Sequence, residues 1–114
     1  MYCFEKIKQN SDFRRIYGRG RSFVHPAFVT YAVKNRYGKT RFGITVSKKL
    51  GGAVMRNRAK RLITAAFRDC LPTIKQGYDL VFVARSRIFS LKSTDVAKIM
   101  AEHFEKADIV NKNE

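Results

Sequence analysis

Residues 48–68 read KKLGGAVMRNRAKRLITAAFR and combine seven cationic side chains with an apolar stripe and no carboxylate. Apolar residues spaced three and four positions apart predict an amphipathic helix over residues 53–70 that packs one face on a core. The predicted stripe consists of Met55, Ala59, Leu62, Ile63, Ala66, Phe67 and Cys70. Gly52 is expected as its N-cap and Pro72 as its end.

The opposite face of this helix carries charges that oppose its own stability. Arg56 and Lys60 stand four positions apart, and Arg58 and Arg61 stand three apart. Like charges at these spacings cost about 0.2–0.5 kcal/mol per pair, and cations near a helix N-terminus oppose the macrodipole. A polyanion that neutralises the cluster would offset this repulsion, which favours nucleic acid as the partner over a merely solvated charged face.

The net charge of +15 is unevenly distributed along the 114 residues. Residues 1–68 hold 17 Lys and Arg against only Glu5 and Asp12, whereas residues 69–114 hold seven side chains of each sign. The first part therefore carries +15 and the second part carries zero. A binding face concentrates charge in this way, whereas a solubility device spreads it over the surface.

The segments on either side of this helix predict an α+β fold. Ser11 can cap a short helix that Gly18 and Gly20 end, with Arg14 and Arg15 on its polar face. Strands are expected over residues 21–24, 28–34, 41–47 and 78–85, with residues 35–39 as a hairpin turn. Ser93 or Thr94 could cap a last helix with apolar positions from Val96 to Ala107. The predicted order is αβββαβα, in one compact domain spanning residues 1–114 with a mixed four-stranded sheet packed against helices.

Residues that could perform catalysis are scarce. Metal-dependent nucleases need clustered carboxylates, and the basic part offers only Glu5 and Asp12. His25 and His103 have no partner at a spacing typical of acid/base catalysis, and Cys3 and Cys70 fit neither a zinc site nor a disulfide scaffold. We expect no catalytic residue and no metal site in the protein, which indicates a binding protein.

The sequence also indicates where the protein acts. The first ten residues lack the apolar segment of a signal peptide, and no apolar run is long enough to span a membrane. We therefore expect a cytoplasmic protein without a membrane contact, and nothing indicates an obligate protein partner.

Aromatic side chains form a second group: Phe13 and Tyr17 on the first helix and Tyr31 on the strand over residues 28–34. Core packing is one interpretation, above all for Phe13. The alternative is stacking on unpaired bases, worth about 1–3 kcal/mol per base, which a half-exposed Tyr31 beside basic residues could provide.

The chain resembles the protein subunit of bacterial ribonuclease P over nearly its whole length. The similarity runs through SDF at residues 11–13, FVTY at 28–31, FGITVSKK at 42–49, GGAV at 51–54 and RNRAKR at 56–61, the last being the family's RNR signature. The order, spacing and chain length together are specific, although each motif alone is weak.

This resemblance implies a ribonucleoprotein in which a large RNA holds the catalytic site and most of the Mg²⁺ and removes the 5′ leader from precursor tRNA. The implied contacts with the catalytic RNA are Lys48, Lys49, Arg56, Asn57, Arg58, Lys60, Arg61 and Arg68. The implied leader contacts are Phe13, Tyr17 and Tyr31, in a cleft between the first helix and the sheet. It also implies a left-handed βαβ crossover between the strand ending near Ser47 and the strand at Tyr78, against the usual right-handed rule.

The chain departs from the family pattern where Thr64 and Ala65 stand in place of a common Arg and Glu. One frequent cationic contact is therefore missing, and Arg68 lies one turn later. A ribosomal or DNA-binding structural protein is the competing hypothesis, because a basic helix can contact phosphates without a catalytic partner. An independent nuclease is the least favoured.

Overall fold

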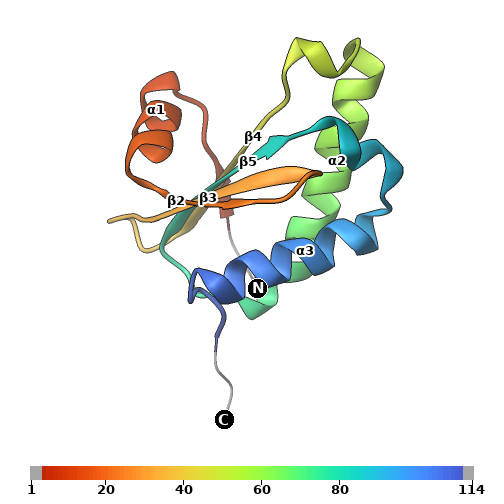
Figure 1. The fold of residues 1–114 in the computed structure, drawn as a ribbon. Coiled ribbons are helices and arrows are strands. Elements are labelled where there is room, and N and C mark those ends of the chain that lie inside the picture. Colours follow the sequence, from red (N-terminus) through yellow and green to blue (C-terminus); the bar gives the residue numbers. More distant parts are fainter. Residues whose placement is uncertain (1–3, 112–114) are drawn as a thin grey trace.

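Five strands form one mixed sheet in the spatial order β1-β4-β5-β3-β2 (Figure 1). The computed structural model describes residues 4–111. Its strands are β1 (Phe4–Lys6), β2 (Arg21–Val24), β3 (Phe28–Lys34), β4 (Thr40–Thr45) and β5 (Tyr78–Ala84). The pairs β1–β4 and β4–β5 are parallel, whereas β5–β3 and β3–β2 are antiparallel.

Three α-helices and three short 3₁₀ segments connect these strands. The helices are α1 (Asn10–Arg19), α2 (Ala53–Cys70) and α3 (Ser93–Lys106), and the 3₁₀ segments are η1 (Lys48–Leu50), η2 (Leu71–Thr73) and η3 (Ser86–Ser90). The α+β class and all three predicted helices are confirmed. No helix within residues 4–111 has the length and apolarity needed to cross a membrane.

The predicted four-stranded sheet is wrong by one strand. β1 adds a fifth strand at the sheet edge, where Phe4 pairs with Thr40 and Lys6 pairs with Phe42. Three residues are too few for an alternating pattern to emerge from the sequence. The element order over residues 4–111 is consequently βαβββαβα.

The predicted hairpin between residues 28–34 and 41–47 is also wrong, because β5 lies between β3 and β4. Asp79 pairs with Val33 on one side and with Arg41 on the other. Leu80, Val81 and Phe82 are all fully buried, so β5 is apolar on both faces and occupies the centre of the sheet. The turn between β3 and β4 therefore connects two strands that are not neighbours in the sheet, and it does not close a hairpin.

The helices lie on both faces of the sheet, with α2 and α3 on one face and α1 on the other (Figure 1). The larger core lies under α2 and α3, where the rings of Phe42 and Phe67 stack with their centroids 4.8 Å apart. The smaller core lies under α1 and centres on Ile16 and Val81. The α1 layer is thin, which leaves part of this sheet face available.

The apolar stripe predicted for α2 is confirmed at five buried positions: Ala59, Ile63, Ala66, Phe67 and Cys70. Leu62 is half-buried beside this core, and Met55 is 37% exposed. Met55 lies in the first turn of α2, one turn before the first buried residue of the helix, Ala59. Its place in the stripe was therefore wrong.

Two of the predicted helix caps differ from the structure. Gly52 is the N-cap of α2, as expected. However, α1 begins at Asn10 after the N-cap Gln9, so Ser11 lies inside the helix. The N-cap of α3 is Lys92, whose backbone N–H donates to the Asp95 carboxylate at 3.0 Å, instead of Ser93 or Thr94.

The chain passes from β4 to its parallel neighbour β5 through α2, which confirms a βαβ crossover at this point. The left hand of that crossover stays a prediction. The crossover matters for function because it brings α2 alongside β4, where α1 approaches from the opposite face.

Candidate nucleic-acid interface

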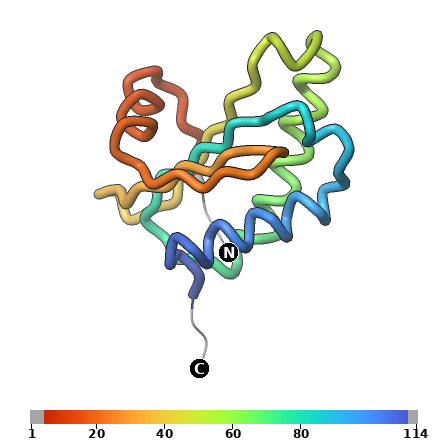
Figure 2. Tube along the Cα trace, in the orientation of Figure 1, coloured from red at the N-terminus to blue at the C-terminus, as the bar shows by residue number. Residues whose placement is uncertain are grey.

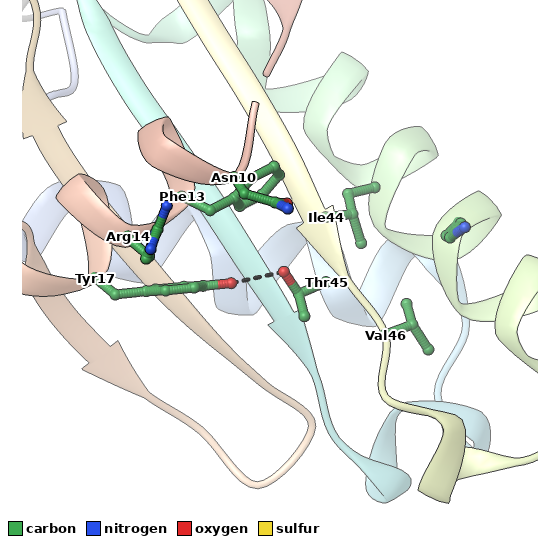
Figure 3. Close-up of a pocket in the computed structure, with 8 residues that line it drawn as sticks. Asn10, Phe13, Arg14, Tyr17, Ile44, Thr45 and Val46 are labelled. Atoms are coloured by element: carbon green, nitrogen blue, oxygen red, sulfur yellow. Dashed lines mark hydrogen bonds between the residues drawn. The ribbon is translucent and has the colours of Figure 1, made fainter. Parts of the chain in front are cut away.

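An open groove of about 700 Å³ lies between α1, the end of β4 and α2 (Figure 3). We call it the aromatic groove. Helix α1 contributes Asn10, Phe13, Arg14 and Tyr17, and β4 with its following residue contributes Ile44, Thr45 and Val46. Lys60 of α2 completes the lining. The groove is therefore apolar at its base and has cationic side chains at its rim.

The three predicted aromatic residues lie together. The rings of Phe13 and Tyr17 have centroids 6.3 Å apart, and the Tyr17 and Tyr31 rings meet edge-on with centroids 4.9 Å apart. Tyr17 is 37% exposed, whereas Phe13 and Tyr31 are half-buried. The cluster therefore lies partly in the core and partly at the surface. Core packing describes the buried parts of Phe13 and Tyr31, and the exposed part of Tyr17 is available for base stacking.

Phe13 is seated on Gly43 of β4. A Cβ atom at Gly43 would lie 2.7 Å from two carbons of the Phe13 ring, closer than real side chains approach. A glycine is therefore needed at this strand position for the ring to approach the strand this closely. This close approach fixes the inner end of the aromatic groove.

A hydrogen bond between side chains crosses the aromatic groove. The hydroxyl groups of Tyr17 and Thr45 lie 2.6 Å apart, which joins α1 to β4 (Figure 3). This bond holds the Tyr17 ring across the groove, with Arg14 beside it. Sequence reasoning missed Thr45 because its strand was assigned only as an element of the sheet.

Helix α1 presents its two adjacent arginines differently from the sequence prediction, which placed both on its polar face. Arg14 lines the aromatic groove with Phe13 and Tyr17. Arg15 instead donates to the buried carboxylate of Asp79 at 2.7 Å. The missed signal was helical spacing, since Arg14 lies three positions before Tyr17 and shares its side of the helix.

The outer face of α2 carries the predicted cationic cluster. Asn57, Arg58, Lys60, Arg61 and Arg68 are all exposed, as are Lys48 and Lys49 in η1. Within residues 4–111, no ion pair is formed by any cation of α2 or η1, and no acidic residue occupies the first turn of α2. The repulsion that the sequence predicts is therefore not relieved inside the described part of the chain.

Arg56 differs from the rest of this cluster because it is half-buried. Its Nε is buried and has no hydrogen-bond partner in the described part of the protein. An unsatisfied buried donor carries a desolvation cost of about 1–3 kcal/mol, more for a charged group. Folding therefore leaves one donor of the Arg56 guanidinium unsatisfied within the described residues.

Thr64 and Ala65 lie in a shallow hollow on this face, between Lys60 and Arg61 on one side and Arg68 on the other. A second hollow lies beside it, where Arg58 and Arg61 meet Ser93 at the start of α3. The cations of α2 therefore surround depressions instead of forming a flat surface. This shape suits a ridge such as a phosphate backbone.

Under α1, the carboxylate of Asp79 is fully buried and accepts four hydrogen bonds. Arg41 donates from Nε to Oδ1 at 2.8 Å and from Nη2 to Oδ2 at 2.9 Å, Arg15 donates to Oδ2, and Asn35 donates to Oδ1 at 2.8 Å. Burial acts to raise the pKa of Asp79, but the hydrogen bonds from Arg41, Arg15 and Asn35 outweigh it and lower the pKa below its ordinary value. This network fixes α1 to β4 and β5, and thereby the position of the aromatic groove.

Cys70 and the acidic residues Asp12 and Asp79 have structural surroundings. Burial, with the nearby charge of Asp69, raises the pKa of the Cys70 thiol to about 11, so Cys70 is a neutral core residue. Cys3 lies outside the described residues. Residues 4–111 contain no group of three or more His, Cys, Asp or Glu side chains that could hold a metal ion, and Asp12 and Asp79 both pair with arginines.

The chain is similar to known proteins over most of its length. A family model described as Ribonuclease P matches residues 1–108. A ribonuclease P protein component of Clostridium botulinum is 42% identical over 107 residues, which cover 93% of this chain and 96% of the relative. A ribonuclease P protein component of Clostridioides difficile is 41% identical over 90% of this chain and 91% of its own length.

Solved structures agree with these sequence matches. The RNase P protein of Staphylococcus aureus superposes with a TM-score of 0.80 at 34% identity, covering 93% of this chain and 97% of that protein. The RNase P protein from Thermotoga maritima superposes with a TM-score of 0.79 at 29% identity, covering 90% and 96%. The chain therefore shares the overall fold of these proteins.

Proposed function

This chain belongs to the family of bacterial ribonuclease P protein components, and from that premise we propose which of its surfaces serves which RNA. It is a subunit of ribonuclease P, the endoribonuclease that processes the 5′ ends of precursor tRNA, and its partner is the ribonuclease P RNA. The proposal concerns the residues that bind, and it treats residues 1–114 as a single RNA-binding domain.

The outer face of α2 docks on the catalytic RNA. What supports this is a group of exposed cations with no ion pair in the described part of the chain. Arginine suits such a surface because its planar fork makes two hydrogen bonds to one phosphate. The docking residues are Lys48, Lys49, Arg56, Asn57, Arg58, Lys60, Arg61 and Arg68.

The aromatic groove binds the single-stranded leader of precursor tRNA. Phe13 and Tyr17 line the groove and offer rings to unpaired bases, and the rim cations face the phosphates. Tyr31 does not line the groove itself, but its ring meets that of Tyr17 edge-on and extends the aromatic surface. The single observation that supports the two-surface assignment most is the position of Lys60. This side chain lines the aromatic groove and also the outer hollow of α2, so leader and catalytic RNA meet at one residue.

Catalysis belongs to the RNA, with Mg²⁺ held mainly by the RNA and the bound substrate. Within residues 4–111, no three His, Cys, Asp or Glu side chains come together as a Mg²⁺ site would need, and Asp12 of α1 and Asp79 beneath it are paired with Arg15 and Arg41. The protein instead supplies cations that reduce phosphate repulsion, which lowers the divalent-ion demand of the complex. The site of action is the cytoplasm, where tRNA is made.

The first experiment adds the purified full chain to the catalytic RNA at low Mg²⁺. Leader cleavage should be restored, because the cations of α2 replace part of the ionic screening that Mg²⁺ provides. An unchanged cleavage rate would reject the proposal. Co-purification with ribosomes instead of an RNA of several hundred nucleotides would favour the competing structural role.

A pair of variants separates the two surfaces. Arg61→Ala should weaken assembly with the catalytic RNA, whereas Tyr31→Ala should weaken binding of precursor tRNA relative to mature tRNA by about tenfold, the loss of one stacked base. Arg61→Lys and Tyr31→Phe are the matched controls, since they keep the charge and the ring. Equal effects of both alanine variants in both assays would contradict this division.

A further inference from the structure

A second cavity, of about 580 Å³, lies on the opposite side of α1 from the aromatic groove. We call it the turn pocket, because residues of α1 line one side and residues at the end of β3 and in the turn between β3 and β4 line the other. Figure 2 shows the course of the chain through α1 and this turn. Its polar lining consists of Arg15, Arg19, Lys34, Asn35, Arg36 and Tyr37. Among residues 4–111, no carboxylate lines the cavity, so its potential is positive.

Three of these cations have no partner in the described part of the chain. Arg19, Lys34 and Arg36 are exposed, and within residues 4–111 none of their side chains forms an ion pair or a hydrogen bond. They come from α1, from the end of β3 and from the turn, so only the fold brings them together. Their mutual repulsion is unexplained by the fold and would be relieved by an anionic ligand.

Tyr37 forms an exposed platform beside these cations. Its side chain is 62% exposed, and the guanidinium of Arg41 lies 4.5 Å from the centroid of its ring. Arg41 is itself held by the buried Asp79, so one face of the ring is covered by a fixed cation. The other face is open to solvent and can accept a stacked base.

The turn that carries Tyr37 is ordered by Asn35. The Asn35 side chain accepts the backbone N–H of Tyr37 at 3.0 Å and donates to the Lys39 carbonyl and to Asp79, each at 2.8 Å. Gly38 has a φ of 69°, which a glycine adopts without strain. The platform is therefore pre-organised, which reduces the entropy cost of binding.

We propose that the turn pocket binds an unpaired RNA nucleotide, with its base stacked on Tyr37 and its phosphates against Arg19, Lys34 and Arg36. The open ring selects an unpaired base over a duplex, whose base faces are already stacked. The turn pocket has the geometry and charge for this ligand whichever RNA the aromatic groove or the α2 face contacts.

Fluorescence anisotropy with the full chain and a 5′-labelled oligouridylate of twelve nucleotides tests the stacking. Tyr37→Ala should weaken binding about tenfold, whereas Tyr37→Phe keeps the ring and should bind like the parent chain. Lys34→Gln with Arg36→Gln should lower the slope of log affinity against log salt by about 1.4. Lys98→Gln with Lys106→Gln removes the same charge from α3 and should leave the slope unchanged.

The assembled enzyme distinguishes the two sources of such a nucleotide. If the leader supplies it, Tyr37→Ala raises KM for precursors with long leaders but not for those with leaders of one or two nucleotides. If the catalytic RNA supplies it, Tyr37→Ala weakens assembly in the absence of precursor. The proposal is overturned if Tyr37→Ala matches Tyr37→Phe in anisotropy, KM and assembly, with thermal unfolding showing that both variants are folded.

Discussion

At the scale of single residues, Asp79 connects the fold to two of the three proposed RNA sites, the turn pocket and the aromatic groove. Its carboxylate holds Arg41, which supports the Tyr37 platform, and Arg15, which orients α1 over the aromatic groove. A buried carboxylate with two arginine partners is costly to disrupt, because removing one charge leaves the others uncompensated. The position of the aromatic side chains therefore depends on a residue that touches no RNA.

Asp79→Asn should lower the free energy of unfolding by about 3 kcal/mol, measured by urea denaturation, because Arg41 and Arg15 lose their buried counter-charge. Asp12→Asn is the matched control. Asp12 contacts the same two arginines only at 3.5 and 3.6 Å and is partly exposed, so its loss should cost less than about 1 kcal/mol. If both variants lowered the free energy of unfolding equally, the buried position of Asp79 would add nothing to its pairing with the two arginines.

His103 makes the stability of the protein depend on pH. The side chain is 4% exposed, its Nδ1 lies 2.8 Å from the Thr30 hydroxyl, and burial, with the charges of His25 and Lys106, lowers its pKa to about 4. The unfolded chain takes up this proton near pH 6.5, whereas the folded chain takes it up only near pH 4. Folding is therefore opposed as the pH falls through this window.

We expect the free energy of unfolding to decrease by about 3 kcal/mol between pH 6.5 and pH 4, and His103 to contribute no pH dependence above pH 7.5. Urea denaturation across this range measures the effect. His103→Gln, which can still hydrogen-bond to Thr30, should be less stable at pH 7 but should lose most of the slope. An unchanged slope in His103→Gln would assign the acid sensitivity to another group.

At the scale of elements, the sequence predicted the individual helices and strands better than it predicted which strands lie next to one another in the sheet. The α2 stripe and β3 follow from periodicity, because each buries one face in the regular way. The position of β5 between β3 and β4 did not follow, since a strand that is apolar on both faces indicates burial but not which strands flank it. The turn pocket depends on that arrangement and was therefore missed.

Helix α2 combines poor intrinsic stability with a surface suited to RNA, and one substitution should separate these properties. Arg58→Glu replaces the repulsion between Arg58 and Arg61 with an attraction, which should stabilise the free protein by up to about 1 kcal/mol at low salt. The same variant should weaken assembly with the catalytic RNA more than tenfold. Arg58→Gln should give intermediate values of both quantities.

Urea denaturation of the free chain and titration with the catalytic RNA measure the two effects. Opposite signs are the essential result, because they would show that α2 retains its charge for binding and not for folding. If Arg58→Glu destabilised the free protein, the Arg58 guanidinium of the parent chain would instead have a structural role.

At the scale of the whole molecule, the aromatic groove is lined by α1, β4 and α2, and it meets the α2 face at Lys60. The sequence predicted the residues of each surface, but Thr45 and Arg14 entered the groove only when α1, β4 and α2 were placed together. The groove as a whole is lined by residues of three elements that no local sequence pattern connects. The charge asymmetry, by contrast, was visible in the sequence, and the fold places its α2 and η1 cations on an exposed face.

This asymmetry predicts how RNA assembly depends on salt. Each phosphate contact that a cation makes adds about 0.7–0.9 to the slope of log affinity against log salt. Lys60→Gln with Arg61→Gln should therefore reduce the slope for the catalytic RNA by about 1.5, whereas Lys98→Gln with Lys106→Gln on α3 should not change it. If both pairs reduced the slope equally, the net charge of the molecule would drive assembly, and the α2 face would not be a contact surface.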